Sequence, residues 1–232
     1  MDNHFNEFEI SLSNINELID LPKSTQEIAL QLLNSIDKNN LKPQEQLQLN
    51  NCIGGIQNIS DGSFGAAFKI IYNQVCILGV SALSAYVEKY FQEYAQENID
   101  RIIQLADVSK LKITLKELSG LNLNIHDNIG QIIINKGESI NFQDLQSILR
   151  SFQSYLDKSI TMPVTLKDDI IFYQQCRHVL VHNNGVVNDE FMRKVGTANK
   201  KGYSATEQVQ LDKDDWTAIQ RSFLEFYKLI TT

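Results

Sequence analysis

Cysteine, proline and tryptophan are scarce in this chain of 232 residues, which has three cysteines, three prolines and one tryptophan. Its cysteines, Cys52, Cys76 and Cys176, are far apart in the sequence and form no CxxC pair. An odd number of separated thiols suits neither a disulfide framework nor a zinc site. We therefore expect reduced cysteines, no bound metal and a cytoplasmic protein.

The sequence also lacks a basic leader and a long apolar run. The first twenty residues carry acids such as Asp2 and Glu7, and no basic stretch precedes an apolar one, so we expect no secretory signal. The longest apolar run, 75–83, is interrupted by Gly79 and Ser81, whereas a helix that crosses a bilayer needs about 20 apolar residues. The sequence therefore predicts no association with a membrane.

Positive charge is in the minority, because the net charge is −7 and the pI is near 5.1. Such a balance disfavours a protein that coats nucleic acid without selectivity. Residues 177–201 depart from it, since they contain five lysines or arginines and only two acids. A local cationic patch on an acidic body can guide a phosphate to one site. The alternative interpretation is that these charges belong to an ordinary solvated surface and bind no phosphate.

Apolar residues make up 43% of the chain and repeat at helical spacing over most of it. The strongest helix is predicted from about 66 to 100. Three further helices are predicted to begin near residues 141, 166 and 212. We expect an all-α helical bundle in which the stripes 68–94 and 216–230 pack around the helix at 170–180.

The first 60 residues are predicted to be a helical extension, separate from a helical domain at 61–232. Ser24 begins a capping-box pattern that is typical of a helix start. Pro43 suits the first turn of another short helix. The glycine-rich stretch 50–65 is predicted to be a loop and the boundary between the two parts.

Other local signals are weaker. Residues 107–137 are ambiguous, because the three isoleucines at 132–134 suit a short strand while Gly120 or Gly130 could end helices. Thr165 stands in a capping-box pattern and is predicted to start the helix that follows it.

The segment Arg-His-Val-Leu-Val-His-Asn-Asn-Gly at 177–185 carries the most distinctive chemistry. At 100° per residue, Arg177, His178 and His182 share one arc at the end of this helix, and Gly185 can take the left-handed conformation that ends it. A guanidinium binds a phosphate, and an imidazole exchanges a proton near neutral pH. Because RNA supplies its own 2′-OH nucleophile, these groups can cleave a phosphodiester without a metal.

Four residues separate Arg177 from His182. This spacing matches the Rx4–6H motif of the HEPN superfamily (higher eukaryotes and prokaryotes nucleotide-binding). Over about 168–216 the chain resembles stand-alone HEPN ribonucleases of toxin and defence systems. The motif helix is followed there by Val-His-Asn-Asn-Gly-Val-Val-Asn-Asp-Glu-Phe and a terminal helix. The long helix with Glu88 fits more loosely, and residues 1–60 are not covered.

The resemblance implies a helical bundle that forms a homodimer, with the two motifs facing one cleft. It also implies a metal-independent endoribonuclease that leaves 2′,3′-cyclic phosphate and 5′-OH ends, with Arg177 and His182 as the catalytic pair. RNA is then the substrate, no cofactor is expected, and an antitoxin or another defence protein is a possible partner. The remaining predicted site residues are His178, Asn183, Arg193 and Lys194 for substrate binding, and Glu88 and Tyr173 for support.

The match departs from the family at Asn184, where toxins silenced by a partner nucleotidyltransferase have a tyrosine in Rx4HxY. That form of control is not expected here. A second interpretation stays open, because many HEPN domains are non-catalytic modules for dimerisation, partner binding or nucleotide binding. In that case Arg177 would be neutralised by Glu88 or Asp169, and His182 would only cap the negative end of its helix.

Overall fold

The computed structural model describes residues 2–58 and 64–232, and within these ranges it is an all-α protein without a β-sheet. An isolated antiparallel bridge joins Val186 and Gln208. The predicted fold class is therefore confirmed. The helices are α1 (Asp2–Asn34), η1 (Lys38–Asn40), α2 (Pro43–Asn58), α3 (Phe64–Glu97), α4 (Ile99–Ile102), α5 (Ala106–Ser109), α6 (Leu115–Gly120), η3 (His126–Asn128), α7 (Ile129–Lys136), α8 (Leu145–Leu156), α9 (Val164–His182), α10 (Asp189–Val195), η4 (Gly196–Ala198) and α11 (Lys213–Thr231).

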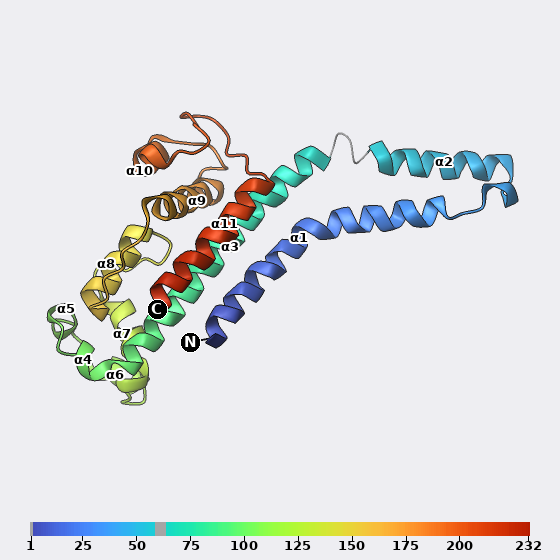
Figure 1. Cartoon of the computed structure of the whole chain (residues 1–232). Helices are drawn as coiled ribbons and strands as arrows, with labels where there is room; N and C mark the ends of the chain where they lie inside the picture. The colour runs from blue at the N-terminus through green and yellow to red at the C-terminus, as the bar shows by residue number, and fades with distance from the viewer. Residues whose placement is uncertain (1, 59–63) are drawn as a thin grey trace.

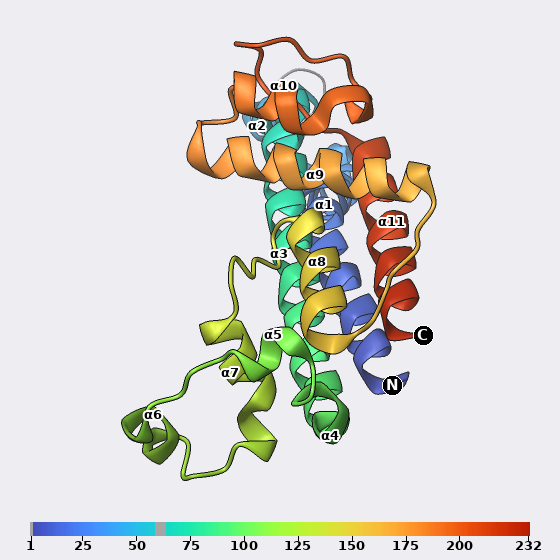
Figure 2. The ribbon, with the colours of Figure 1, turned by 90° about the vertical axis from the view of Figure 1, so that its left-hand side faces the viewer.

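Helix α3 is the centre of the bundle, with α1 and α11 running along it and α9 crossing both α3 and α11 (Figures 1 and 2). Tyr90 of α3 is buried and Tyr86 is half-buried. Gly79 lets α11 approach closely, because a Cβ at this position would lie 3.2 Å from the ring of Trp216. The predicted contacts of both stripes with the 170–180 helix are confirmed, but α3 and not that helix lies at the centre.

The N-terminal part differs from the prediction of short helices. Helix α1 runs unbroken through Pro22, so the capping box predicted at Ser24 is wrong. A proline inside a helix removes one hydrogen bond and bends the helix, and α1 changes direction along its length in Figure 1. The first half of α1 stays helical because Phe8 and Leu12 are buried in the core.

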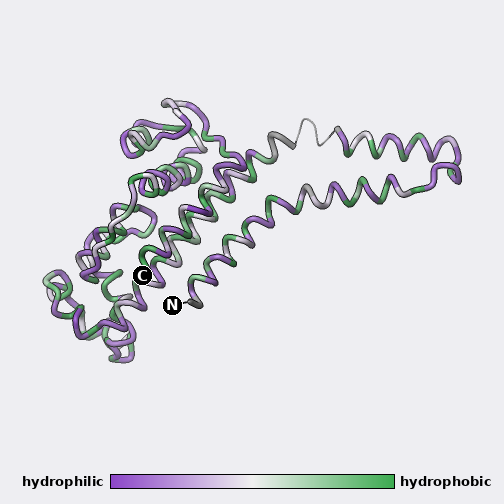
Figure 3. The backbone as a smooth tube through the Cα atoms, in the orientation of Figure 1, coloured by the Kyte–Doolittle hydropathy of each residue, from purple (hydrophilic) through white to green (hydrophobic). Residues whose placement is uncertain are grey.

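Beyond this bend, α1 and α2 form a hairpin that projects from the bundle (Figure 1). Apolar and polar positions alternate along both arms in Figure 3, and aliphatic side chains such as Leu21 and Leu32 are exposed. Helix α2 begins at Pro43, as predicted. The loop predicted at 50–65 is wrong as far as Asn58, because α2 continues to that residue. Residues 59–63, and with them the predicted boundary at 60/61, lie outside the described residues.

The three isoleucines at 132–134 belong to helix α7, so the suggested strand is wrong. Their helical form follows from packing on α3, which buries Ile129, Ile132 and Ile133. Gly130 lies in the first turn of α7 and does not end a helix. A Cβ there would lie 2.5 Å from the Cα of Gln92, so only glycine permits this crossing.

Two helix starts near the motif also differ from the prediction. Helix α8 begins at Leu145, four residues later than expected, because the Asp144 side chain accepts a hydrogen bond from the Ser147 N–H and caps it. Helix α9 begins at Val164 after Pro163, so Thr165 lies inside the helix and is not its cap. The start of α11 is confirmed, since Asp212 is its N-cap.

By length and composition alone, residues 68–97 of α3 would be long and apolar enough to cross a membrane. The sequence analysis did not find this property, because it considered only uninterrupted apolar runs. The same composition suits a helix at the centre of a bundle, and α3 contacts α1, α9, α11 and α7.

Candidate functional site

Helix α9 ends at the motif in a turn that fixes the last residues. The Asn183 N–H and the Gly185 N–H both donate to the carbonyl of Val179, at 2.9 and 2.8 Å. Asn184 and Gly185 have positive φ angles of 51° and 77°, so Gly185 takes the conformation predicted for it. The Asn183 side-chain amide donates to the Val186 carbonyl at 2.5 Å. Asn183 therefore holds the turn and does not face the cavity described next.

The motif opens onto a cavity of about 590 Å³. Its walls come from the segment before α8, from α8 itself, from α9, and from α10 through Lys194. The ionisable side chains that line it are Asp144, Arg150, Arg177, His178, His182 and Lys194. Arg150 and Arg177 face one carboxylate, Asp144, in this cavity, while Lys194 pairs with Glu190 at 3.0 Å. The lining therefore carries an excess of positive charge.

The two histidines on its wall are in contact but differ in environment. Their ring centroids are 4.9 Å apart and their planes are inclined by 48°. His182 is exposed at the helix end, whereas His178 is half-buried. Burial lowers the pKa of His178; Glu190 opposes this shift, and the nearby charges of His182, Lys194 and Arg177 add to it. His178 is therefore mainly neutral at pH 7.

Three polar atoms on this wall are buried without a hydrogen-bond partner in the part of the chain that the structure describes. They are Arg177 Nε, Gln174 Nε2 and Gln175 Oε1. Gln174 and Gln175 are only 3% and 5% exposed, and both line the cavity. A buried donor or acceptor left unpaired costs about 1–3 kcal/mol.

Arg177 is not neutralised in the way that the non-catalytic interpretation required. Among the described residues, neither Glu88 nor Asp169 forms an ion pair with it. Asp169 instead pairs with Lys200 and, at 3.3 Å, with Arg221. The guanidinium of Arg177 therefore lines the cavity without an ion pair to either carboxylate.

The remaining predicted site residues lie elsewhere. Glu88 is on α3, where its carboxylate accepts a hydrogen bond from Gln92 at 3.3 Å. Tyr173 is buried between α9 and α11, and its hydroxyl donates to Asp215 Oδ1 at 3.3 Å. Arg193 is exposed outside the cavity. Glu88 and Tyr173 therefore belong to the scaffold of the bundle.

Sequence reasoning missed Arg150, Gln174 and Gln175. Gln174 lies three residues before Arg177, and Gln175 lies three residues before His178, so helical spacing could have revealed them. Arg150 lies on α8, and only the packing of α8 against α9 brings it to this cavity. No local pattern signals that contact.

Groups of three or more His, Cys, Asp or Glu side chains that could hold a metal ion are not found among the described residues. No family model matches this chain, and comparisons with curated proteins and with solved structures found no match.

Proposed function

We propose that this chain is a metal-independent endoribonuclease of the HEPN type. The observation that carries the proposal is that Arg177, His178 and His182 line one cationic cavity. A phosphodiester is the substrate that fits these groups, since it brings negative charge and several acceptor oxygens. The resemblance of residues 168–216 to HEPN ribonucleases supports the same assignment.

In this mechanism the ribose 2′-OH attacks the adjacent phosphorus and the bond to the 5′ oxygen breaks. His182 takes the proton from the 2′-OH or returns one to the leaving oxygen, because its ring is exposed and lines the cavity. Arg177 stabilises the charge that develops on the phosphate oxygens. His178 donates or accepts a hydrogen bond to the substrate, and Lys194 adds charge from α10.

We also propose that two copies assemble with their motifs facing one cleft. The protein would act in the cytoplasm as a toxin or antiviral effector, with an antitoxin or a defence protein as its partner.

The test is cleavage of a mixed RNA by purified protein in excess EDTA. Cleavage should persist and leave 2′,3′-cyclic phosphate ends, because attack by the neighbouring 2′-OH needs no metal-bound water. Loss of cleavage in EDTA, or products with 3′-OH ends, would contradict the proposal.

A second candidate is a non-catalytic module that binds a nucleotide in the same cavity. The lining with Arg150 and Arg177 suits this candidate, because these cations bind a phosphate whether or not a reaction follows. In that case a nucleotide would bind and remain intact.

A further inference from the structure

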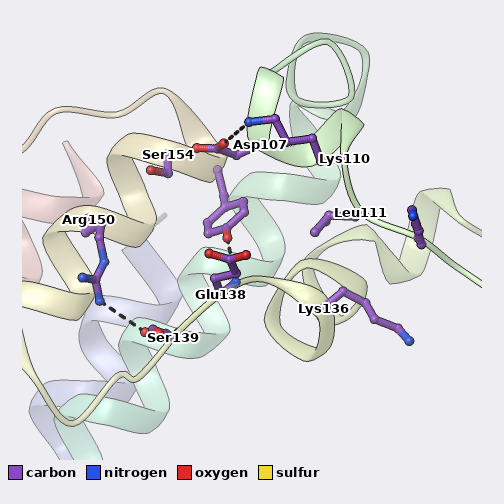
Figure 4. A pocket seen from close by; sticks show the side chains of 10 residues that line it. Asp107, Lys110, Leu111, Lys136, Glu138, Ser139, Arg150 and Ser154 are labelled. Atoms are coloured by element: carbon purple, nitrogen blue, oxygen red, sulfur yellow. Dashed lines mark hydrogen bonds and ion pairs between the residues drawn. The ribbon is translucent and has the colours of Figure 1, made fainter.

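A second cavity of about 550 Å³ adjoins the first one, and nothing in the motif or in the proposed reaction assigns a role to it. Its walls come from the segment 107–112, from the end of α7 and from α8 (Figure 4). Ser139 and Arg150 line both cavities, so the two spaces meet at these residues.

The boundary between the two cavities is a well-fixed turn. Ser139 has a positive φ of 57°, which a residue other than glycine adopts only when its surroundings hold it. Its carbonyl accepts hydrogen bonds from Ser147 Oγ at 2.8 Å and from Arg150 Nη2 at 3.4 Å. Arg150 is exposed, and its hydrogen bond to the Ser139 carbonyl directs the side chain along the boundary (Figure 4).

The second cavity also carries an excess of positive charge. Lys110, Lys112, Lys136 and Arg150 line it, against the two acids Asp107 and Glu138. Lys110 pairs with Asp107 at 3.2 Å, and Lys136 pairs at 2.5 Å with Glu117, which lies outside the cavity. In the described part of the chain, no acidic partner is found for Lys112 or Arg150. With Arg177, they form a series of unneutralised cations along the two cavities of a chain whose net charge is −7.

The lining of this second cavity suits phosphates better than bases. Its one aromatic residue, Tyr155, is 7% exposed, and its hydroxyl accepts a hydrogen bond from the Glu138 N–H. A base that stacks needs an open aromatic face, and this cavity offers none. Lysine and arginine side chains recognise the backbone of a nucleic acid without reading its sequence.

We propose that the second cavity binds the phosphodiester backbone of the RNA strand that flanks the nucleotide at His182, with Arg150 contacting the strand where the cavities meet. The assignment of the flanked nucleotide rests on the proposed function. Binding of the strand itself requires no cleavage. The substrate is then a single strand of several nucleotides, bound without sequence preference outside the first cavity.

The experiment measures binding of fluorescent 2′-O-methyl oligouridylates, which cannot be cleaved, as a dinucleotide and as a dodecamer. Lys112→Ala should weaken dodecamer binding about tenfold and lower the magnitude of its salt dependence by about 0.7 in the slope of log K against log salt. Dinucleotide binding should not change. The control is Lys116→Ala, which removes the same charge from an exposed lysine on α6 outside the cavity.

A second variant works in the opposite direction. The Glu138 carboxylate has no cationic partner among the described residues, so Glu138→Gln should tighten dodecamer binding several-fold by removing a repulsive charge. Equal effects of Lys112→Ala and Lys116→Ala would overturn the proposal, as would equal affinity for the two lengths or no binding of either one. If the wild type cleaves RNA but Lys112→Ala binds the dodecamer normally, the second cavity is unassigned while the proposed function stands. Length- and Lys112-dependent binding without cleavage would instead contradict the ribonuclease alone.

Discussion

The imidazole rings of His178 and His182 lie side by side at the end of α9, with their centroids 4.9 Å apart. Their spacing of four residues puts them one helical turn apart on the same arc. The helix ends directly after His182, which leaves this ring exposed, while His178 is half-buried and has a lowered pKa. One arc of one helix thus presents two imidazoles that differ in burial to a single cavity.

Replacing His182 with alanine should lower the rate of RNA cleavage about 100- to 10,000-fold, which is the usual contribution of a general acid or base. The rate should be measured at saturating substrate. The comparison requires that the variant has the same melting temperature as the wild type. His126→Ala is the matched control, because His126 is an exposed histidine on η3 outside the cavity. A His182→Ala variant as active as the His126→Ala variant would remove His182 from the mechanism.

Arg177→Met should separate activity from stability. Arg177 Nε is buried without a partner, so an apolar side chain of similar length removes an unpaired donor that costs about 1–3 kcal/mol. Thermal unfolding should therefore show equal or higher stability than the wild type, while cleavage is lost. Arg193→Met, at an exposed position outside the cavity, should change neither quantity. A strong destabilisation by Arg177→Met would mean that this guanidinium is a structural group.

The lowered pKa of His178 predicts a specific dependence of stability on pH. Its ordinary value is 6.5, and the folded state holds the pKa below it. The unfolded state therefore binds more protons as the pH falls below 6.5, and the free energy of unfolding decreases. In His178→Gln this decrease should be smaller between pH 6.5 and about pH 5, above the range in which ordinary carboxylates titrate. Melting curves at several pH values measure the difference, and parallel pH profiles for the two proteins would contradict it.

Helical spacing predicted α3, α9 and α11, whose apolar residues recur every three or four positions. It did not predict that the first half of α1, with Phe8 and Leu12, belongs to the same core. The motif helix ends as the sequence indicates, since Gly185 permits the left-handed turn there. The composition of the site was less predictable. Arg150 reaches the cavity only through the packing of α8, and Glu88 lies elsewhere on α3 although the family resemblance suggested it.

Local signals failed where long-range packing decides the structure. Ser24 has the sequence of a helix cap, yet α1 continues past it and has its N-terminal half packed on the core. The isoleucines at 132–134 have high strand propensity, but they are helical because α7 packs on α3. Propensity is a weak signal, and burial of apolar surface outweighs it in α7. Burial does not explain the continuation of α1 through Ser24, because Leu21 and Ile28 are exposed.

Gly130→Ala tests the close contact between α7 and α3. A methyl group at this position would lie 2.5 Å from the Cα of Gln92, so the helices must move apart. Overpacking of this kind costs about 1–3 kcal/mol, and each kcal/mol lowers Tm by about 2–4 °C in a domain of this size. Gly54→Ala is the control: it lies in α2 with nothing within 4 Å of its Cβ, and should leave Tm unchanged or raise it. If the Gly130→Ala protein were as stable as the wild type, α7 would not pack this closely against α3.

Val181 provides a test of the proposed dimer. It lies between Arg177 and His178 on the arc of α9, at 40° from Arg177, and it is 44% exposed. If two copies face each other through their motifs, this aliphatic side chain lies in the interface, and a charge there would be buried without a partner. We expect light scattering to give about twice the chain mass of 26.4 kDa for the wild type and a lower mass for Val181→Glu.

Val164→Glu is the matched control for this test, because the same residue type is 72% exposed at the opposite end of the same helix. It should remain dimeric and active. Val181→Glu should lose cleavage together with the dimer, since each proposed cleft needs the motif of the second copy. A wild type that is monomeric yet cleaves RNA, or a Val181→Glu monomer that retains full activity, would show that one copy is sufficient for the reaction at His182.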